Sequence, residues 1–331
     1  MAHLLETLAN GSASIAWTNE VPWHHLGVQM DNNATPTEFF IAAGLDTTVS
    51  KRPLFLADGT EVHSSRLLCR DSDNTQYSIV GADWNPVQNM EIAEFLTRLF
   101  EAGDIKMETA GAVKNGALVW GLGKIQKSFD LPGGDEVHTN LLISSAHLYG
   151  KATTIRTTST RVVCFNTLSA ALSEKSEHVF RVNHRQDWTD KEIQNEAERV
   201  VLGATRDMDK FEEAARVLAA TTVTQRQIEE TIAEVYQPNL LTDESRVNKD
   251  HPLRIDFAAL AESVLVAVEC SPGATLKSAK GTAWGLLNAV TFVEDHQSMA
   301  KTRESALQSA WWGAGAARKQ KALEACLRLA A

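Results

Sequence analysis

Short apolar runs separated by turn-forming residues occupy most of the first half of the chain. Their β-branched and aromatic content predicts strands at 49–58, 64–71, 75–82 and 116–125. Residues 139–147 and 151–158 flank the sequence Leu-Tyr-Gly and predict a hairpin, whereas DLPGGDEV at 130–137 predicts a longer loop. The first half is therefore expected to be mostly antiparallel sheet.

One segment in this half has helical spacing instead. Its apolar residues recur at intervals of three and four between Ile92 and Phe100. Asn85 is expected to cap this helix, Pro86 to take its first position and Gly103 to end it. We expect the helix to lie on one face of the sheet.

The second half of the chain has helical patterns throughout. A T-x-x-E sequence at Thr189 and a T-x-x-Q sequence at Thr224 are helix-start signals, and three further apolar helical segments follow. Residues 237–252 are polar and contain two prolines, so they predict an exposed connection. These patterns predict an α+β fold, with a β-rich domain at residues 1–185 and a helical domain at 186–331.

Composition is that of a globular protein, and we expect the protein to stay in the cytoplasm. The 331 residues are 44% hydrophobic and 22% charged. No apolar run reaches the roughly 18 residues that a membrane span needs, and the first residues lack the features of a signal peptide. The four cysteines are far apart and form no C-x-x-C pair, so no zinc site is expected.

The charge is negative overall but unevenly spread. The net charge is −10, which argues against a general nucleic-acid scavenger. From Val137 to Ser173, however, there is no acidic residue, and from His296 to Ala331 there are six bases against two acids. These basic islands suggest binding sites, although islands of this size also arise by chance in many enzymes.

A ribbon of hydroxyl side chains lies inside the first basic island. Six of the eight residues from Thr153 to Thr160 carry hydroxyls. Alternate residues of a strand share a face, so Thr154, Arg156 and Thr158 are expected on one face and Ile155 on the other. Hydroxyls and arginines are common donors to phosphate oxygens, which favours a surface that binds a nucleic-acid backbone. The alternative is an ordinary threonine-rich exposed strand, because threonine favours strands.

The residues after this ribbon extend the predicted site. Arg161 adds a base, and Asn166 or Thr167 is expected to cap a helix through Leu168 and Leu172, whose N-terminus would attract an anion. Cys164 lies between apolar neighbours and is expected to be a buried thiol rather than a nucleophile.

A second candidate site lies in the basic tail. Trp311 and Trp312 precede Arg318 and Lys319, and aromatic side chains beside cations are typical of single-strand binding. The alternative places the tryptophans in a helical core. In either case we expect the basic residues to be exposed.

The sequence contains no motif that demands an enzyme. It has no nucleotide-binding loop, no nucleophile–base signature and no paired carboxylates, so no cofactor or metal is expected. The adjacent histidines of PWHHLG point apart on a strand and are expected to pack or to contact a protein. An active site assembled from distant residues stays open as an alternative.

Five segments occur in an order that resembles a known family. They are PWHHLG, GADWNPVQNMEIAEFL, RVVCFNTLSAAL, TAWGLLNAVTFVEDH and WWGAGAARKQKAL. Together they resemble the phage- and plasmid-borne domain-of-unknown-function family 932 over nearly the whole chain. The resemblance implies a phage or mobile-element origin and supplies no reaction. The layout is also loosely similar to phage single-strand annealing proteins, which cradle a strand and assemble into rings.

One departure from the family concerns the predicted hairpin. The family often has an Asp-Gly turn there, whereas this chain has HLYGK at 147–151. An aromatic residue and a lysine thus stand near the place of an acid. If the tip touches a ligand, this version is expected to prefer an anion more strongly.

The leading hypothesis is a non-enzymatic, oligomeric phage or mobile-element protein that binds and anneals single-stranded DNA during recombination. Repetition of a modest site around a ring gives avidity without a strongly basic monomer. The alternative is a phage protein that binds a host defence or replication factor without DNA. The expected nucleic-acid contacts are Lys151, Thr154, Arg156, Thr158, Arg161 and Asn166, with Trp311, Trp312, Arg318 and Lys319 as a secondary site or subunit contact.

Overall fold

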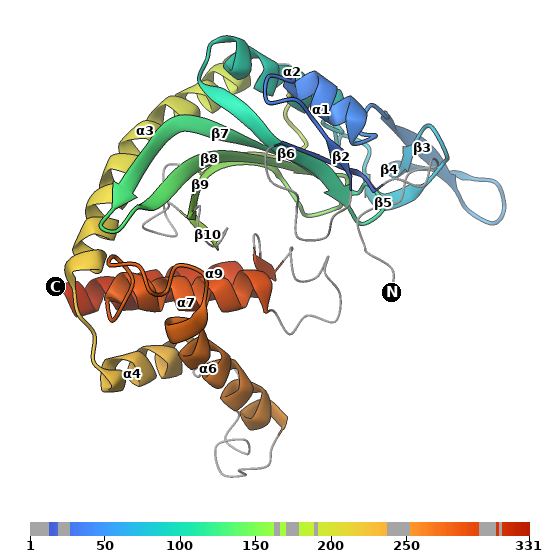
Figure 1. Cartoon of the computed structure of the whole chain (residues 1–331). Helices are drawn as coiled ribbons and strands as arrows, with labels where there is room; N and C mark the ends of the chain where they lie inside the picture. Colours follow the sequence, from blue (N-terminus) through green and yellow to red (C-terminus); the bar gives the residue numbers. More distant parts are fainter. Residues whose placement is uncertain are drawn as a thin grey trace. The chain divides into compact units, whose positions relative to one another are not determined.

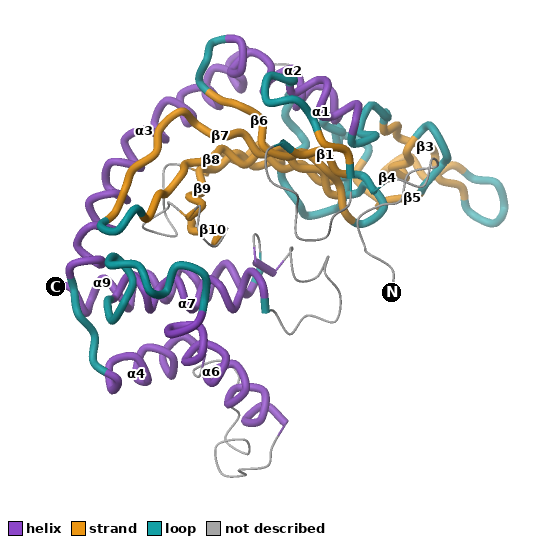
Figure 2. The backbone as a smooth tube through the Cα atoms, viewed as in Figure 1, coloured by secondary structure: helices purple, strands orange, loops and turns teal. Residues whose placement is uncertain are grey.

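The chain has an α+β fold, with its sheets in the first half and its helices mainly in the second (Figure 2). The computed structural model describes residues 13–18, 27–161, 166–169, 179–188, 191–236, 252–297, 309–310 and 313–331. The chain divides into two compact units. The first unit comprises residues 1–126, 140–157 and 177–204, and the second comprises residues 127–139, 158–176 and 205–331.

The larger sheet has the strand order β10-β9-β8-β7-β6-β1-β2, and Figure 1 labels β6 to β10 along it. Strand β11 also pairs with β9. Its strands are β1 (Ile15–Trp17), β2 (Val28–Gln29), β6 (Ile105–Val113), β7 (Leu118–Leu131), β8 (Asp135–Ala146), β9 (Thr153–Arg161), β10 (Asn166–Ser169) and β11 (Val179–Val182). The expected hairpin is confirmed as β8 and β9. The longer loop expected at 130–137 is wrong, because β7 and β8 are joined by a tight turn in which Gly133 and Gly134 take positive φ.

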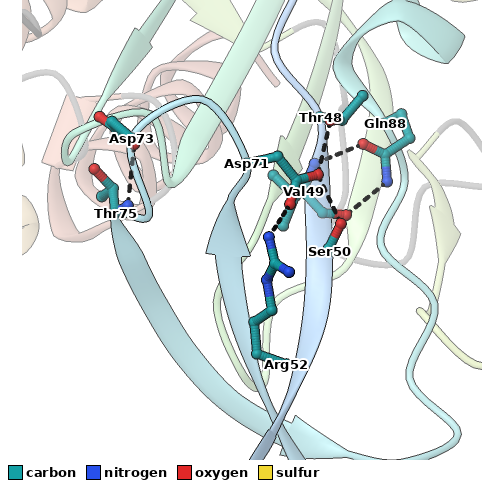
Figure 3. Close-up of polar contacts among 8 residues, drawn as sticks. All are labelled: Thr48, Val49, Ser50, Arg52, Asp71, Asp73, Thr75 and Gln88. Atoms are coloured by element: carbon teal, nitrogen blue, oxygen red, sulfur yellow. Dashed lines mark hydrogen bonds and ion pairs between the residues drawn. The ribbon is translucent and has the colours of Figure 1, made fainter.

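A smaller sheet in the first unit has the order β3-β4-β5. It consists of β3 (Val49–Phe55), β4 (Glu61–Arg70) and β5 (Gln76–Gly81), which confirms the strands expected there. Polar contacts close its end at Asp71, whose carboxylate accepts hydrogen bonds from the hydroxyls of Thr48 and Ser50 and from Arg52 (Figure 3). These bonds, that of Ser50 above all, lower the pKa of Asp71. This part of the smaller sheet is therefore held by its own side chains.

Two helices cover one face of the larger sheet within the first unit (Figure 1). Helix α1 (Pro36–Ala42) buries Phe39 and Phe40 against β6, β7, β8 and β9, and helix α2 (Asn89–Glu101) buries Ile92, Phe95, Leu96 and Leu99 there. The expected helix on the sheet is thus confirmed, and it ends before Gly103, which takes positive φ. Its expected cap is wrong, because the N-cap is Gln88, three residues after Asn85, and Gln88 forms a capping box with Glu91.

The remaining helices are α3 (Lys191–Ala220), α4 (Gln225–Tyr236), α6 (Pro252–Cys270), α7 (Ala283–His296) and α9 (Ala314–Ala330). Helix α3 begins in the first unit and continues into the second, where the others pack around Trp284, Phe211 and Leu287. Thr224 and Gln227 exchange hydrogen bonds at the start of α4, as the sequence predicts. The signal at Thr189 and residues 237–251 lie outside the described residues. No helix in the described ranges is both long and apolar enough to cross a membrane.

Candidate nucleic-acid interface

The pairing of β9 with β11 sets the geometry of the predicted site within the first unit. The two strands are antiparallel, with Arg181 opposite Thr154 and Val179 opposite Arg156. Ile155 is buried in the core beneath α2, so its neighbours Thr154 and Arg156 point to the other face of the sheet. Arg181 shares this face because directly paired residues lie on the same side. We call the surface made by Thr154, Arg156 and Arg181 the β9–β11 face.

The two arginines of the β9–β11 face differ in exposure. Arg181 is exposed, and no ion pair is found for it among the described residues, whereas Arg156 is only partly exposed. Burial, followed by the nearby charge of Arg181, lowers the pKa of Arg156 to about 10. Arg156 therefore remains charged at neutral pH. Two like charges on neighbouring strands repel each other, and an anion bound by both would reduce that repulsion.

Hydroxyl groups lie beside these arginines. The Thr154 and Ser144 hydroxyl oxygens are 2.8 Å apart and form a hydrogen bond across β8 and β9. A pair of hydroxyls has two protons, and one of them suffices for the bond between the two oxygens. The pair therefore retains one O–H that can donate to a phosphate oxygen.

The turn between β8 and β9 carries Tyr149 and Lys151 on its surface. Gly150 has a φ of 74°, a left-handed conformation that glycine adopts without strain. The Tyr149 amide donates to the Ser78 hydroxyl at 3.1 Å, and the Lys151 amide donates to the Leu148 carbonyl. The turn is therefore fixed both internally and to β5.

A buried histidine anchors the base of this turn. His147 is fully buried, its ring stacks on Tyr77 with centroids 5.5 Å apart, and its Nε2 lies 3.2 Å from the Asn89 side-chain oxygen. Burial, with a smaller effect of His184, lowers the pKa of His147 to about 4. His147 is thus neutral at physiological pH and serves as a packed support for the turn rather than as a cation.

Three other predicted contacts follow farther along the chain. Thr158 and Arg161 belong to β9 and Asn166 belongs to β10, where it pairs with Arg161, but their side chains lie outside the described residues. The helix expected after Asn166 or Thr167 is wrong for residues 166–169. These residues form a strand because their backbone pairs with β9.

Two bases of the tail, Arg318 and Lys319, are paired with acids of α7. Arg318 donates two hydrogen bonds to Glu294, at 2.7 and 2.8 Å, and Lys319, only 4% exposed, binds Asp295 at 2.6 Å. The prediction of exposure is wrong for both residues because α9 packs against α7, which carries the two acids. Trp311 and Trp312 lie outside the described residues.

Sequence reasoning missed Arg181 as a member of the site. The alternation in Val-Phe-Arg-Val at 179–182 is typical of a strand, and its partner could not be read from local pattern. Among the described residues, no cluster of three or more histidine, cysteine, aspartate or glutamate side chains could hold a metal ion. The chemistry on offer at the β9–β11 face is hydrogen bonding and positive charge.

Comparison with curated proteins and with solved structures returned no match. The family described as Domain of unknown function (DUF932) matches residues 76–312, which is more than half of the chain and includes the strands of the β9–β11 face. The chain therefore belongs to the DUF932 family.

Proposed function

We propose that this protein binds the backbone of single-stranded DNA on the β9–β11 face and promotes annealing in recombination of a phage or mobile element. The observation that carries the proposal is the strand register. It sets Arg156, Arg181 and a hydroxyl pair on one face of the sheet, and Arg156 and the hydroxyl pair belong to the run from Val137 to Ser173 that has no acid. Phosphate oxygens accept hydrogen bonds from both kinds of donor, independently of base sequence.

Each cation has a distinct part in this proposal. The exposed Arg181 and Lys151 contact phosphates, whereas the partly buried Arg156 raises the local positive potential behind them. Backbone contacts leave the bases free to pair with a second strand. Because holding a strand extended lowers the ordering cost of pairing, annealing needs neither a nucleotide nor a metal.

The net charge of −10 requires that binding be shared among several subunits. A single site with two exposed cations binds a polyanion weakly, and the rest of the chain repels it. An oligomer repeats the site along one strand, so that the second and later contacts are intramolecular. The proposal therefore includes self-association, which makes binding cooperative in DNA length.

Fluorescence anisotropy of labelled single-stranded DNA across a salt series tests the proposal, with oligomer size measured by light scattering on the same samples. We expect salt-sensitive binding by an oligomer. The double variant Lys151→Gln/Arg181→Gln is expected to lower the slope of log affinity against log salt by about 1.4 for each subunit on the strand, from about 0.7 per phosphate contact. Arg226→Gln, which removes an exposed arginine of α4, is the matched control and is expected to leave the slope unchanged. Absence of binding at low salt by the folded oligomer would overturn the proposal.

A second candidate is binding to a host protein without DNA. Phe55 and Leu56 are exposed in and just after β3, before Gly59 turns the chain back toward β4. Exposed apolar side chains at the tip of a projecting hairpin are typical of a protein contact. This candidate predicts that Phe55→Ser abolishes co-purification of the partner while the variant stays folded, and that the wild type has no affinity for DNA.

A further inference from the structure

We infer that Tyr149 stacks on one unpaired base of the bound strand while Lys151 contacts the adjacent phosphate. This inference rests on the proposed function and adds a base-binding residue to it. Tyr149 is 73% exposed, more than any other large hydrophobic side chain that is exposed among the described residues. A single exposed ring is common on protein surfaces, so the argument depends on how this ring is held and on what surrounds it.

The backbone that carries the ring is fixed before any ligand binds. The Tyr149 amide donates to Ser78 of β5, and the Lys151 amide closes the turn on Leu148. Immediately before the turn, the His147 amide donates to the Ala117 carbonyl at 2.8 Å, and its ring is packed on Tyr77. A side chain on such a support loses little conformational freedom on binding, and tyrosine has only two side-chain torsions to order.

The surroundings of the ring select an anionic ligand with a flat face. Lys151 is exposed two residues from Tyr149, and no ion pair is found for it among the described residues. The strand that leaves the turn leads directly to Thr154 and Arg156 of the β9–β11 face. An aromatic ring beside a cation, at the end of a phosphate-binding strand, matches the chemistry of an unpaired nucleotide. A base within a duplex does not fit, because its faces are already covered by its neighbours.

Stacking is tolerant of sequence but depends on ring area. Each base has a π-face, so a strand of any sequence can place a nucleotide on Tyr149. Purines offer a larger face than pyrimidines, and we expect poly-purine strands to bind more tightly than poly-pyrimidine strands of equal length. We expect this preference for purine strands to disappear when the tyrosine ring is removed.

The test compares Tyr149→Ala and Tyr149→Phe with the wild type, using labelled oligo-dA and oligo-dT in the same salt series. Loss of a stacked base weakens binding by about 5- to 150-fold for each subunit on the strand, so Tyr149→Ala is expected to bind oligo-dA at least about 5-fold more weakly. Tyr149→Phe keeps the ring and is expected to bind within about twofold of the wild type. The slope against salt is to remain unchanged in both variants, because a stacking residue neutralises no phosphate.

The outcomes separate this inference from the proposed function. If the wild type binds and Tyr149→Ala binds equally well, the base-stacking role is overturned while the backbone-binding face stands. If Tyr149→Phe is as weak as Tyr149→Ala, the hydroxyl rather than the ring face is responsible and stacking is again overturned. If the wild type binds no oligonucleotide, both proposals fall together. Because the side chain is exposed, we expect equal thermal unfolding of all three proteins.

Discussion

Replacing Arg318 by methionine is expected to lower the free energy of unfolding of the second unit by about 3 kcal/mol. Glu294 is 3% exposed, and both of its carboxylate oxygens accept hydrogen bonds from the Arg318 guanidinium. Without the guanidinium, the carboxylate is left buried without its countercharge, a change that costs about 3–5 kcal/mol in proteins. We take the lower end because a quarter of the Arg318 side chain is exposed to water.

Two further variants isolate the cause. In Arg318→Met/Glu294→Leu neither charge is buried, and we expect stability within about 1 kcal/mol of the wild type. Arg328→Met removes an arginine of the same helix whose partner is Glu234 in an exposed pair, with side chains 57% and 45% exposed. Such a pair contributes at most about 1 kcal/mol, so this variant is the matched control.

Urea unfolding followed by circular dichroism measures these differences, and hydrogen exchange of peptides from α7 and α9 assigns them to the helical unit. A loss of less than about 0.5 kcal/mol in Arg318→Met would refute the reasoning, since it would mean that water reaches Glu294. The same variant also bears on function. Under the proposed function, we expect its folded fraction to have wild-type affinity for DNA, because Arg318 is paired with Glu294 and not available to phosphate.

Two other predictions concern titration and reactivity. Burial lowers the pKa of His147 to about 4, so as the pH falls the unfolded chain binds a proton at this histidine before the folded chain does. The neutral, buried His147 therefore contributes stability that is complete above about pH 6.5 and is lost as the pH falls toward 4. Between pH 7 and 5 we expect the free energy of unfolding to fall by about 2 kcal/mol, measured as faster hydrogen exchange in residues 140–157. In His147→Gln this fall is expected to be smaller. In a Cys164→Ser background at pH 8, a thiol reagent is expected to modify exposed Cys270 rapidly and buried Cys326 only on unfolding, because burial raises the pKa of Cys326 to about 12. Equal rates at the two thiols would contradict the burial of Cys326.

Local patterns in the sequence predicted most of the elements. β-Branched runs located β3, β4, β5 and β7, and the Thr224–Gln227 box located the start of α4. In each case the residues that predict the element are the residues that form it, or lie within a few positions of it. The expected cap at Asn85 failed because both backbone groups of Asn85 bind His184, a residue 99 positions away.

The candidate site was predicted less completely, for the same physical reason. The alternation of Thr154, Ile155 and Arg156 is a local property of a strand and could be read directly. Arg181 belongs to the candidate site because β11 pairs with β9, which local sequence does not reveal. Arg318 and Lys319 are removed from the site by acids of α7 that are 24 residues away in sequence. Charge along a sequence therefore indicates where cations occur, but only packing decides which of them reach solvent.

The discontinuous course of the first unit bears on how the chain folds during synthesis. Its core contains Val182 and Trp188, which follow the hairpin in sequence by many residues, and β11 pairs with one end of β9. When β9 has just emerged from the ribosome, the nascent chain therefore lacks two side chains of this core. Domains generally fold as units as they emerge, and incomplete cores expose apolar surface. We expect the nascent chain to stay protease-sensitive until residue 188 has left the exit tunnel, and chains truncated before β11 to aggregate.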